Sequence, residues 1–190
     1  MNEFVEFRAL RDRALSTLAT AQEALEAACP VQCFSWKFRL SDLGDQISSE
    51  RLIEGVKMTI SFNASAIYCF ELSNSAEYTL LHNKYLSRPV SHPQTGQTLC
   101  YSRLIDEHDP ASIYVGSSRK FPSRLSEHIG RTGGAKTYAM RLKLWAADLH
   151  ADVSLSAWLF DPHIESSVLE LLEQALWDTK RPMLGKRSGK

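Results

Sequence analysis

The sequence predicts an α+β domain, in which a small antiparallel β-sheet is flanked by helices and preceded by an N-terminal helical extension. Two observations predict this class. Over the C-terminal two-thirds of the 190-residue chain, the segments read as strand, insertion, strand, helix, helix, strand and helix, an order that suits a small antiparallel sheet. The composition, 44% hydrophobic and 23% charged, is ordinary for a globular protein and supports a real core.

The N-terminal part is predicted to begin with a helix over about residues 3–28. Apolar residues recur there at steps of three and four, at Leu18, Ala21, Leu25 and Ala28, and Pro30 closes the segment. This apolar stripe can pack on the main domain or on a second copy, so a homodimer through the N-terminal helix is one expectation. A strand is expected at 31–40, and the segment 52–60 suits a helix or a strand.

The remaining elements divide the chain into an N-terminal extension, 1–62, and a domain, 63–190, with an insertion at about 73–110. The run at 66–72 is aliphatic and aromatic and predicts a buried strand, and further strands are expected at 99–105, 112–116 and 153–160. Helices are expected at 76–86, 121–129, 138–147 and 165–177. Pro122 would lie in the first turn of the second of these helices, and Gly130 would follow its end.

The distribution of charge and of apolar residues limits which partners can be expected. Residues 1–111 carry 14 acidic and 10 basic side chains, whereas residues 112–190 carry 8 acidic and 12 basic ones, so a polyanion should meet the C-terminal part. No run of 18 apolar residues is present, and the charged N-terminus lacks the apolar stretch of a signal peptide. We therefore expect a cytoplasmic protein without a membrane partner.

One stretch combines residue types suited to phosphodiester chemistry. A strand ends at Tyr114 and Gly116, and a helix follows in which Arg124 and His128 share one face because they are four residues apart. A guanidinium can stabilise charge on phosphoryl oxygens, and a phenol or an imidazole can move protons. Gly116 would let another backbone or a phosphate approach closely.

This stretch resembles the GIY-YIG nuclease family, which includes homing endonucleases, some restriction enzymes and the excision-repair incision subunit. The second signature of the family, tyrosine-isoleucine-glycine, stands as Tyr114-Val115-Gly116, with the family arginine at Arg124 and the histidine of many members at His128. The resemblance covers about residues 65–187. It implies a metal-dependent endonuclease that hydrolyses DNA phosphodiester bonds.

The first signature, glycine-isoleucine-tyrosine, is degenerate in this chain. Ala66-Ile67-Tyr68 matches better in wording and lies on a convincing strand, but Tyr68 precedes Tyr114 by 46 residues, which requires the insertion. Leu99-Cys100-Tyr101 is the alternative, because Tyr101 is only 13 residues before Tyr114 and would form the usual hairpin. We favour Tyr68 as the catalytic tyrosine of this motif.

The resemblance also implies a carboxylate on the final helix that holds one divalent metal ion. Helical periodicity places Glu170 nearly opposite the apolar arc of this helix and Glu173 just beyond its edge, so Glu173 is the better candidate. An oxygen ligand suits Mg²⁺ or Mn²⁺ better than zinc. By the resemblance, Tyr114 would activate or position water, Arg124 would stabilise the transition-state charge, and His128 would assist proton transfer.

Several basic residues are candidates for contacts with flanking DNA phosphates: Arg119, Lys120, Arg131, Lys186 and Arg187. Two departures from the family pattern support another hypothesis, a catalytically lapsed module that binds nucleic acid or a protein. The first motif is degenerate, and Gly185-Lys186 stands where the family often has an asparagine.

Overall fold

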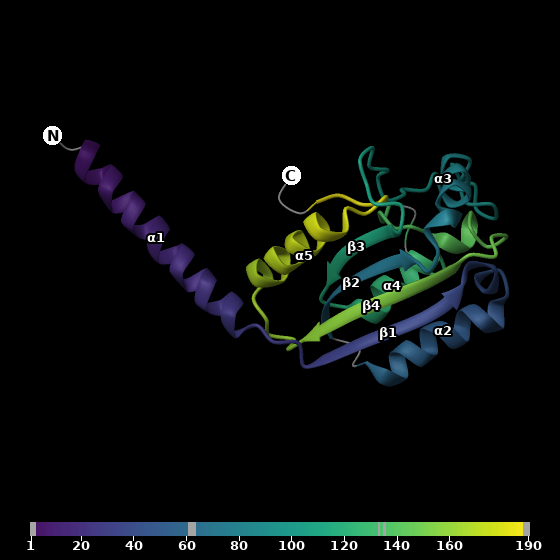
Figure 1. The fold of residues 1–190 in the computed structure, drawn as a ribbon, viewed down its shortest axis with the longest axis horizontal. Coiled ribbons are helices and arrows are strands. Elements are labelled where there is room, and N and C mark those ends of the chain that lie inside the picture. Colours follow the sequence, from purple (N-terminus) through teal and green to yellow (C-terminus); the bar gives the residue numbers. More distant parts are fainter. Residues whose placement is uncertain (1–2, 61–63, 133, 135, 188–190) are drawn as a thin grey trace.

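A four-stranded antiparallel sheet is the centre of the fold, and it confirms the predicted α+β class. The computed structural model describes residues 3–60, 64–132, 134 and 136–187. The strands lie in the order β1-β4-β2-β3, and neighbouring strands run antiparallel (Figure 1). Their bounds are Gln32–Arg39 for β1, Ser65–Leu72 for β2, Ser112–Ser118 for β3 and Asp152–Phe160 for β4.

Helices cover both faces of this sheet. The α-helices are α1 (Glu3–Ala27), α2 (Gln46–Thr59), α3 (Tyr78–Leu86), α4 (Phe121–Ile129) and α5 (Ser166–Lys180). Short 3₁₀ turns occupy Leu40–Leu43, Ser75–Glu77 and Leu142–Leu144. Apolar side chains of α2 and α4 share the main core with one face of the sheet, and α5 packs on the opposite face.

Strand β2 is an unbroken apolar run because it lies inside the sheet and both of its faces are covered. Side chains alternate between the two faces of a strand, and helices cover both faces. Tyr68 and Phe70 therefore enter the main core, whereas Ile67 and Cys69 pack in the clusters beneath α5. In the β2–β3 register, Tyr68 lies directly opposite Gly116, which sets the position of the candidate site.

Helix α4 begins and ends where the sequence predicts. Pro122 lies in its first turn, where a missing backbone N–H costs nothing. Gly130 ends the helix with a φ of 93°, a left-handed conformation that glycine adopts readily. The helix follows β3 almost at once, so its side chains return over the strand that carries Tyr114.

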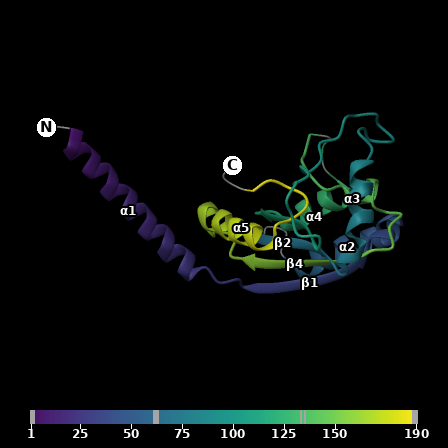
Figure 2. The ribbon, with the colours of Figure 1, turned by 45° about the horizontal axis from the view of Figure 1, so that its top comes forward.

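The N-terminal segment contributes to the same sheet. Strand β1 pairs with β4 along its length, from Gln32 opposite Leu159 to Arg39 opposite Asp152. The segment 52–60, which suited a helix or a strand, belongs to helix α2 except for its last residue. Helix α1 projects away from the sheet in both views (Figures 1 and 2) and contacts α5.

Two predicted elements are wrong. The segment 99–105 forms isolated bridges at Tyr101 and Leu104 in place of a strand, because its partners are the loop residue Ala139 and the C-terminal residue Leu184. The segment 138–147 contains only a 3₁₀ turn in place of a helix, because Arg141 adopts a left-handed conformation with a φ of 55°. The first error arises from contacts between segments far apart in sequence, and the second arises from the backbone conformation of Arg141. Among the described residues, no helix is both long and apolar enough to cross a membrane.

The packing of α2 on β1 gives a testable prediction at Gly55. A Cβ atom at this position would lie 2.5 Å from Cη2 of the half-buried Trp36. Gly55→Ala should therefore lower the free energy of unfolding by about 1 kcal/mol, although alanine usually stabilises a helix. Urea unfolding measures the change. Gly134→Ala is the control, because the nearest atom to its Cβ would be 4.0 Å away, and equal effects at both positions would contradict the prediction.

Candidate active site

Two tyrosine rings form the centre of the candidate site. Tyr68 of β2 and Tyr114 of β3 stack with their centroids 6.1 Å apart. A Cβ atom at Gly116 would lie 2.7 Å from Cε1 of Tyr114 and 3.0 Å from the hydroxyl of Tyr68. The space that a side chain would take at Gly116 is therefore used by the two phenols, and glycine is needed there for a packing reason.

His128 of α4 lies behind the two tyrosines and is fully buried. Its Nε2 lies 3.0 Å from the Tyr68 hydroxyl, and its Nδ1 accepts a hydrogen bond of 3.3 Å from the backbone N–H of Met140. Because Nδ1 is an acceptor, Nε2 carries the hydrogen of the neutral ring and donates a hydrogen bond to the hydroxyl oxygen of Tyr68. The Tyr68 hydroxyl hydrogen then remains available for another acceptor. Burial, with a smaller effect of Arg124, lowers the pKa of His128 well below its ordinary value of 6.5.

Arg124 supplies the positive charge of the site. Its guanidinium donates hydrogen bonds of 2.6 Å to Glu127 Oε2 and of 2.6 Å to the carbonyl oxygen of Tyr138. Burial raises the pKa of Tyr114 and of Tyr68, whereas the charge and hydrogen bonds of Arg124 act in the opposite direction. The arginine therefore makes each phenol easier to ionise than burial alone would allow.

Glu173 approaches from α5 and is only 8% exposed. Its carboxylate accepts a hydrogen bond from the hydroxyl of Ser117, three residues beyond Tyr114 on β3. Alternation along β3 puts Ser117 on the α5 face and Tyr114 on the α4 face. After burial, which is the main cause, the negative charge of Glu173 makes a smaller contribution that also raises the pKa of both tyrosines. Glu170, the weaker candidate, is exposed.

A pocket of about 500 Å³ opens onto part of this cluster, with Tyr114 and Arg124 in its wall. Its other lining residues are Ser102, Arg103, Tyr138, Gly185 and Lys186. Tyr68 and His128 are fully buried. Of the four clustered groups, the pocket therefore presents the Tyr114 phenol and the Arg124 guanidinium to a ligand, and Tyr68 and His128 support them from the core.

Tyr101, the alternative first-motif tyrosine, lies in a different environment. Its ring packs edge-on against Tyr85, and the guanidinium of Arg88 lies 5.0 Å from its centroid. Its buried hydroxyl has no hydrogen-bond partner among the described residues. Of the two candidates, Tyr68 is the one that contacts Tyr114 and His128.

Some of the basic residues proposed for DNA contacts already bind other groups of the protein, and others do not. Arg119 donates to Pro162 O, Ile164 O and the Ser166 hydroxyl, and it thereby holds the loop before α5. Arg131 pairs with Glu50, and Arg187 makes two hydrogen bonds to Asp178. Lys120 and Lys186 are exposed, and neither forms an ion pair among the described residues.

Three contributors to the site were missed by the sequence reasoning. Ser117 holds Glu173, the Tyr138 carbonyl holds Arg124, and Arg103 lines the pocket from the insertion. Only Ser117 could have been predicted from the sequence, because it continues the strand that carries Tyr114.

Gly185 has a φ of 127°, and a Cβ there would lie 2.8 Å from Trp177 and 3.3 Å from Tyr114. This close packing leaves no room for an asparagine side chain at position 185.

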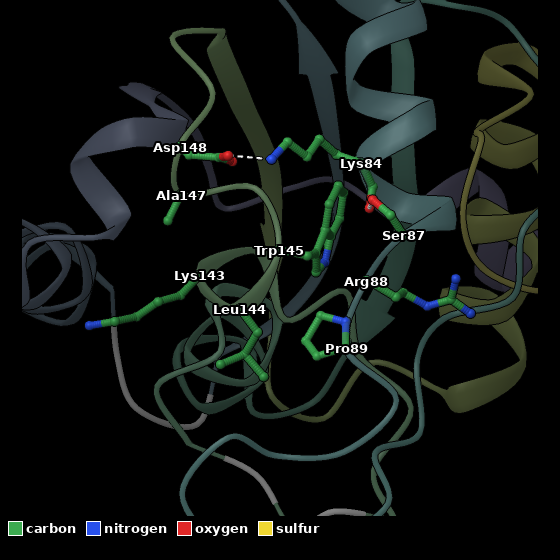
Figure 3. A pocket seen from close by; sticks show the side chains of 9 residues that line it. All are labelled: Lys84, Ser87, Arg88, Pro89, Lys143, Leu144, Trp145, Ala147 and Asp148. Atoms are coloured by element: carbon green, nitrogen blue, oxygen red, sulfur yellow. Dashed lines mark hydrogen bonds and ion pairs between the residues drawn. The ribbon is translucent and has the colours of Figure 1, made fainter.

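A second pocket, of about 440 Å³, lies between the end of α3 and the segment 143–148 (Figure 3). An ion pair between Lys84 and Asp148 crosses it, and the Trp145 indole N–H donates to the Met140 carbonyl. Lys84, Asp148 and the Trp145 indole are thus satisfied, whereas the buried Nε of Arg88 has no partner among the described residues. None of the candidate catalytic residues lines this pocket.

The histidine, cysteine and acidic residues of the described chain form no cluster of three that could hold a metal ion. A site of the expected kind needs one carboxylate, with water completing the coordination. Glu173 is a hard oxygen ligand of the kind that such a site needs, but it lies against Ser117 and does not line the pocket that Tyr114 and Arg124 share. Comparison with protein-family models, with curated proteins and with solved structures finds no match.

The buried neutral imidazole of His128 predicts a specific pH dependence of stability. The unfolded chain takes up a proton on this residue near pH 6.5, whereas the folded chain does not, so stability falls as the pH drops below 6.5. The slope from this residue should reach about 1.4 kcal/mol per pH unit. Urea unfolding between pH 7.5 and 5 gives the free energy of unfolding of the wild type and of His128→Gln. The difference between these two free energies should shrink as the pH falls, and the rate at which it shrinks is the slope due to His128. His163→Gln, at an exposed position, should leave the slope unchanged, and a constant gap for His128→Gln would contradict the assignment.

Proposed function

We propose that this protein is a cytoplasmic, metal-dependent endonuclease that hydrolyses DNA phosphodiester bonds through a GIY-YIG-type site. One observation carries the proposal. Tyr68, Tyr114, Arg124 and His128, which lie up to 60 residues apart in sequence, form one contacting cluster. A structural role for each residue separately would not require them to meet.

The pocket suggests how the roles divide. A phosphate in it would meet Arg124, whose guanidinium is held by Glu127 and the Tyr138 carbonyl and is thus ready to stabilise charge that develops on phosphoryl oxygens. Tyr114 would position the attacking water, because its hydroxyl lies next to this cation. Tyr68 and His128 would fix the ring of Tyr114 and share a proton within the buried cluster.

Mg²⁺ or Mn²⁺ is the cofactor that this donor set fits. Glu173 would hold the ion, and Ser117 orients its carboxylate. A bound divalent cation would supply Lewis-acid stabilisation of the phosphate and of the leaving oxygen.

Cleavage of supercoiled plasmid in the presence of Mg²⁺ or Mn²⁺ tests the proposal. Arg124→Ala and Glu173→Gln should each lower the nicking rate by on the order of 10²-fold or more, because each removes charge stabilisation at the transition state. Glu170→Gln is the matched control on the same helix, since Glu170 is exposed, and it should retain activity. Nicking that survives both site variants would refute the assignment.

A second candidate function is a lapsed module that binds nucleic acid or a protein without cleaving. The observation in its favour is Gly185, whose close packing leaves no room for the family asparagine. Binding of DNA that weakens with salt, with no nicking under either metal, would support this alternative.

The free cations at the pocket predict where DNA binds. Arg103 and Lys186 are exposed, line the pocket and form no ion pair among the described residues, whereas Arg187 is held by Asp178. Arg103→Ala and Lys186→Ala should each reduce the salt dependence of DNA binding by about 0.9 in the log–log slope, equal to one phosphate contact. Fluorescence anisotropy in EDTA measures this without cleavage. Arg187→Ala should have a smaller effect, and an effect as large as that of Arg103→Ala would contradict the prediction.

A further inference from the structure

Helix α1 exposes apolar side chains over a long surface. It has 25 residues and therefore extends about 38 Å, and it projects from the domain (Figures 1 and 2). Residues 6–20 are all exposed, and among them Phe7, Leu10, Leu15 and Leu18 are each 57–66% exposed. The domain thus leaves residues 6–20 uncovered, whereas Ala21, Leu25 and Ala28 are half-buried. Contiguous exposed apolar surface marks an interaction site.

The stripe has the spacing of a coiled coil. One row places a residue every seven positions at Phe7, Ala14, Ala21 and Ala28, and a second row, four positions on from the first, contains Arg11, Leu18 and Leu25. Rows that alternate by three and four residues form the seam of a two-stranded coiled coil. In the first row every residue after Phe7 is an alanine, with a small side chain. In the second row all three side chains are long.

We propose that α1 pairs with α1 of a second copy as an antiparallel coiled coil centred near Ser16. In that register, Ala14 faces the partner's Leu18 and Ala21 faces the partner's Arg11. Each of these layers combines one long and one small side chain, so the two helices can keep a constant separation over the central layers. Phe7 faces the partner's Leu25 at each end.

Parallel pairing would fit poorly. Leu18 would face Leu18 and Ala14 would face Ala14, so wide and narrow layers would alternate within one turn and leave gaps. Arg11 would also face the partner's Arg11 inside the apolar seam, where two like charges repel. The same size pattern that suits the antiparallel pair thus disfavours the parallel one.

Charge along the helix favours the same orientation. Segment 8–13 carries three arginines and one aspartate, whereas segment 19–24 carries a single charge, on Glu23. The antiparallel register sets these two segments beside each other, so their net charges have opposite signs. A parallel pair would set the arginine segment beside its own copy.

Sedimentation equilibrium of the full chain tests the association. The wild type should have about twice the mass of the 21.4 kDa chain, and Leu18→Glu should weaken dimerisation at least 100-fold. Leu80→Glu, on α3 and 54% exposed, is the matched control and should remain dimeric. Because Leu18 lies far from the core, the variant should keep the circular dichroism spectrum and the melting temperature of the domain. A wild type that is monomeric at about 50 µM, or a Leu18→Glu variant that is still dimeric, would overturn the proposal.

Distances between spin labels on the native Cys29 test the orientation. Cys29 is exposed just after α1, and a chain with Cys33→Ser and Cys100→Ser leaves it as the accessible thiol, since Cys69 is buried. The antiparallel register separates the two labelled positions by about 39 Å along the axis, at 1.5 Å per residue. A separation under about 15 Å would show a parallel pair and overturn the proposed register.

Discussion

The close approach of two phenol rings beside Gly116 is the constraint on which the candidate site depends. It requires the β2–β3 register that sets Tyr68 opposite Gly116, and it requires a residue without a side chain at that point. Helix α4 then leads back over β3 and brings His128 against both rings. A slip of one residue between the strands would turn Tyr68 to the α5 face and separate these groups.

The electrostatics of the cluster follow from its burial. Two phenols and an imidazole remain neutral because ionisation in a dry environment is costly, and the charge of Arg124 is balanced by Glu127 at its rim. The site therefore holds a guanidinium that is fixed before any ligand arrives. In the reaction that we propose, preorganised charge of this kind would stabilise the developing phosphorane without reorientation of the guanidinium.

Local pattern predicted much of this architecture, and contacts between distant segments account for the rest. Pro122 and Gly130 gave the bounds of α4, and helical periodicity singled out Glu173, which faces the sheet. The strand predicted at 99–105 was wrong because the residues that pair with this segment lie far away in the sequence. Arg103 and Tyr138 reach the pocket from loops, where no periodicity marks them. Spacing alone could not show that Arg187 is held by Asp178.

The C-terminal segment after α5 covers the outer edge of β3. Leu184 donates to the Ile113 carbonyl, and Met183 donates to that of Ser112, so backbone acceptors at this edge are already satisfied. The opposite edge is β1, where Lys37 carries a positive charge and Arg39 pairs with Asp152 of β4. An uncovered edge strand is a template for unwanted strand addition, and charged side chains discourage it. Both edge strands are thereby protected against strand addition: the C-terminal segment covers β3, and charged side chains on β1 discourage a further strand.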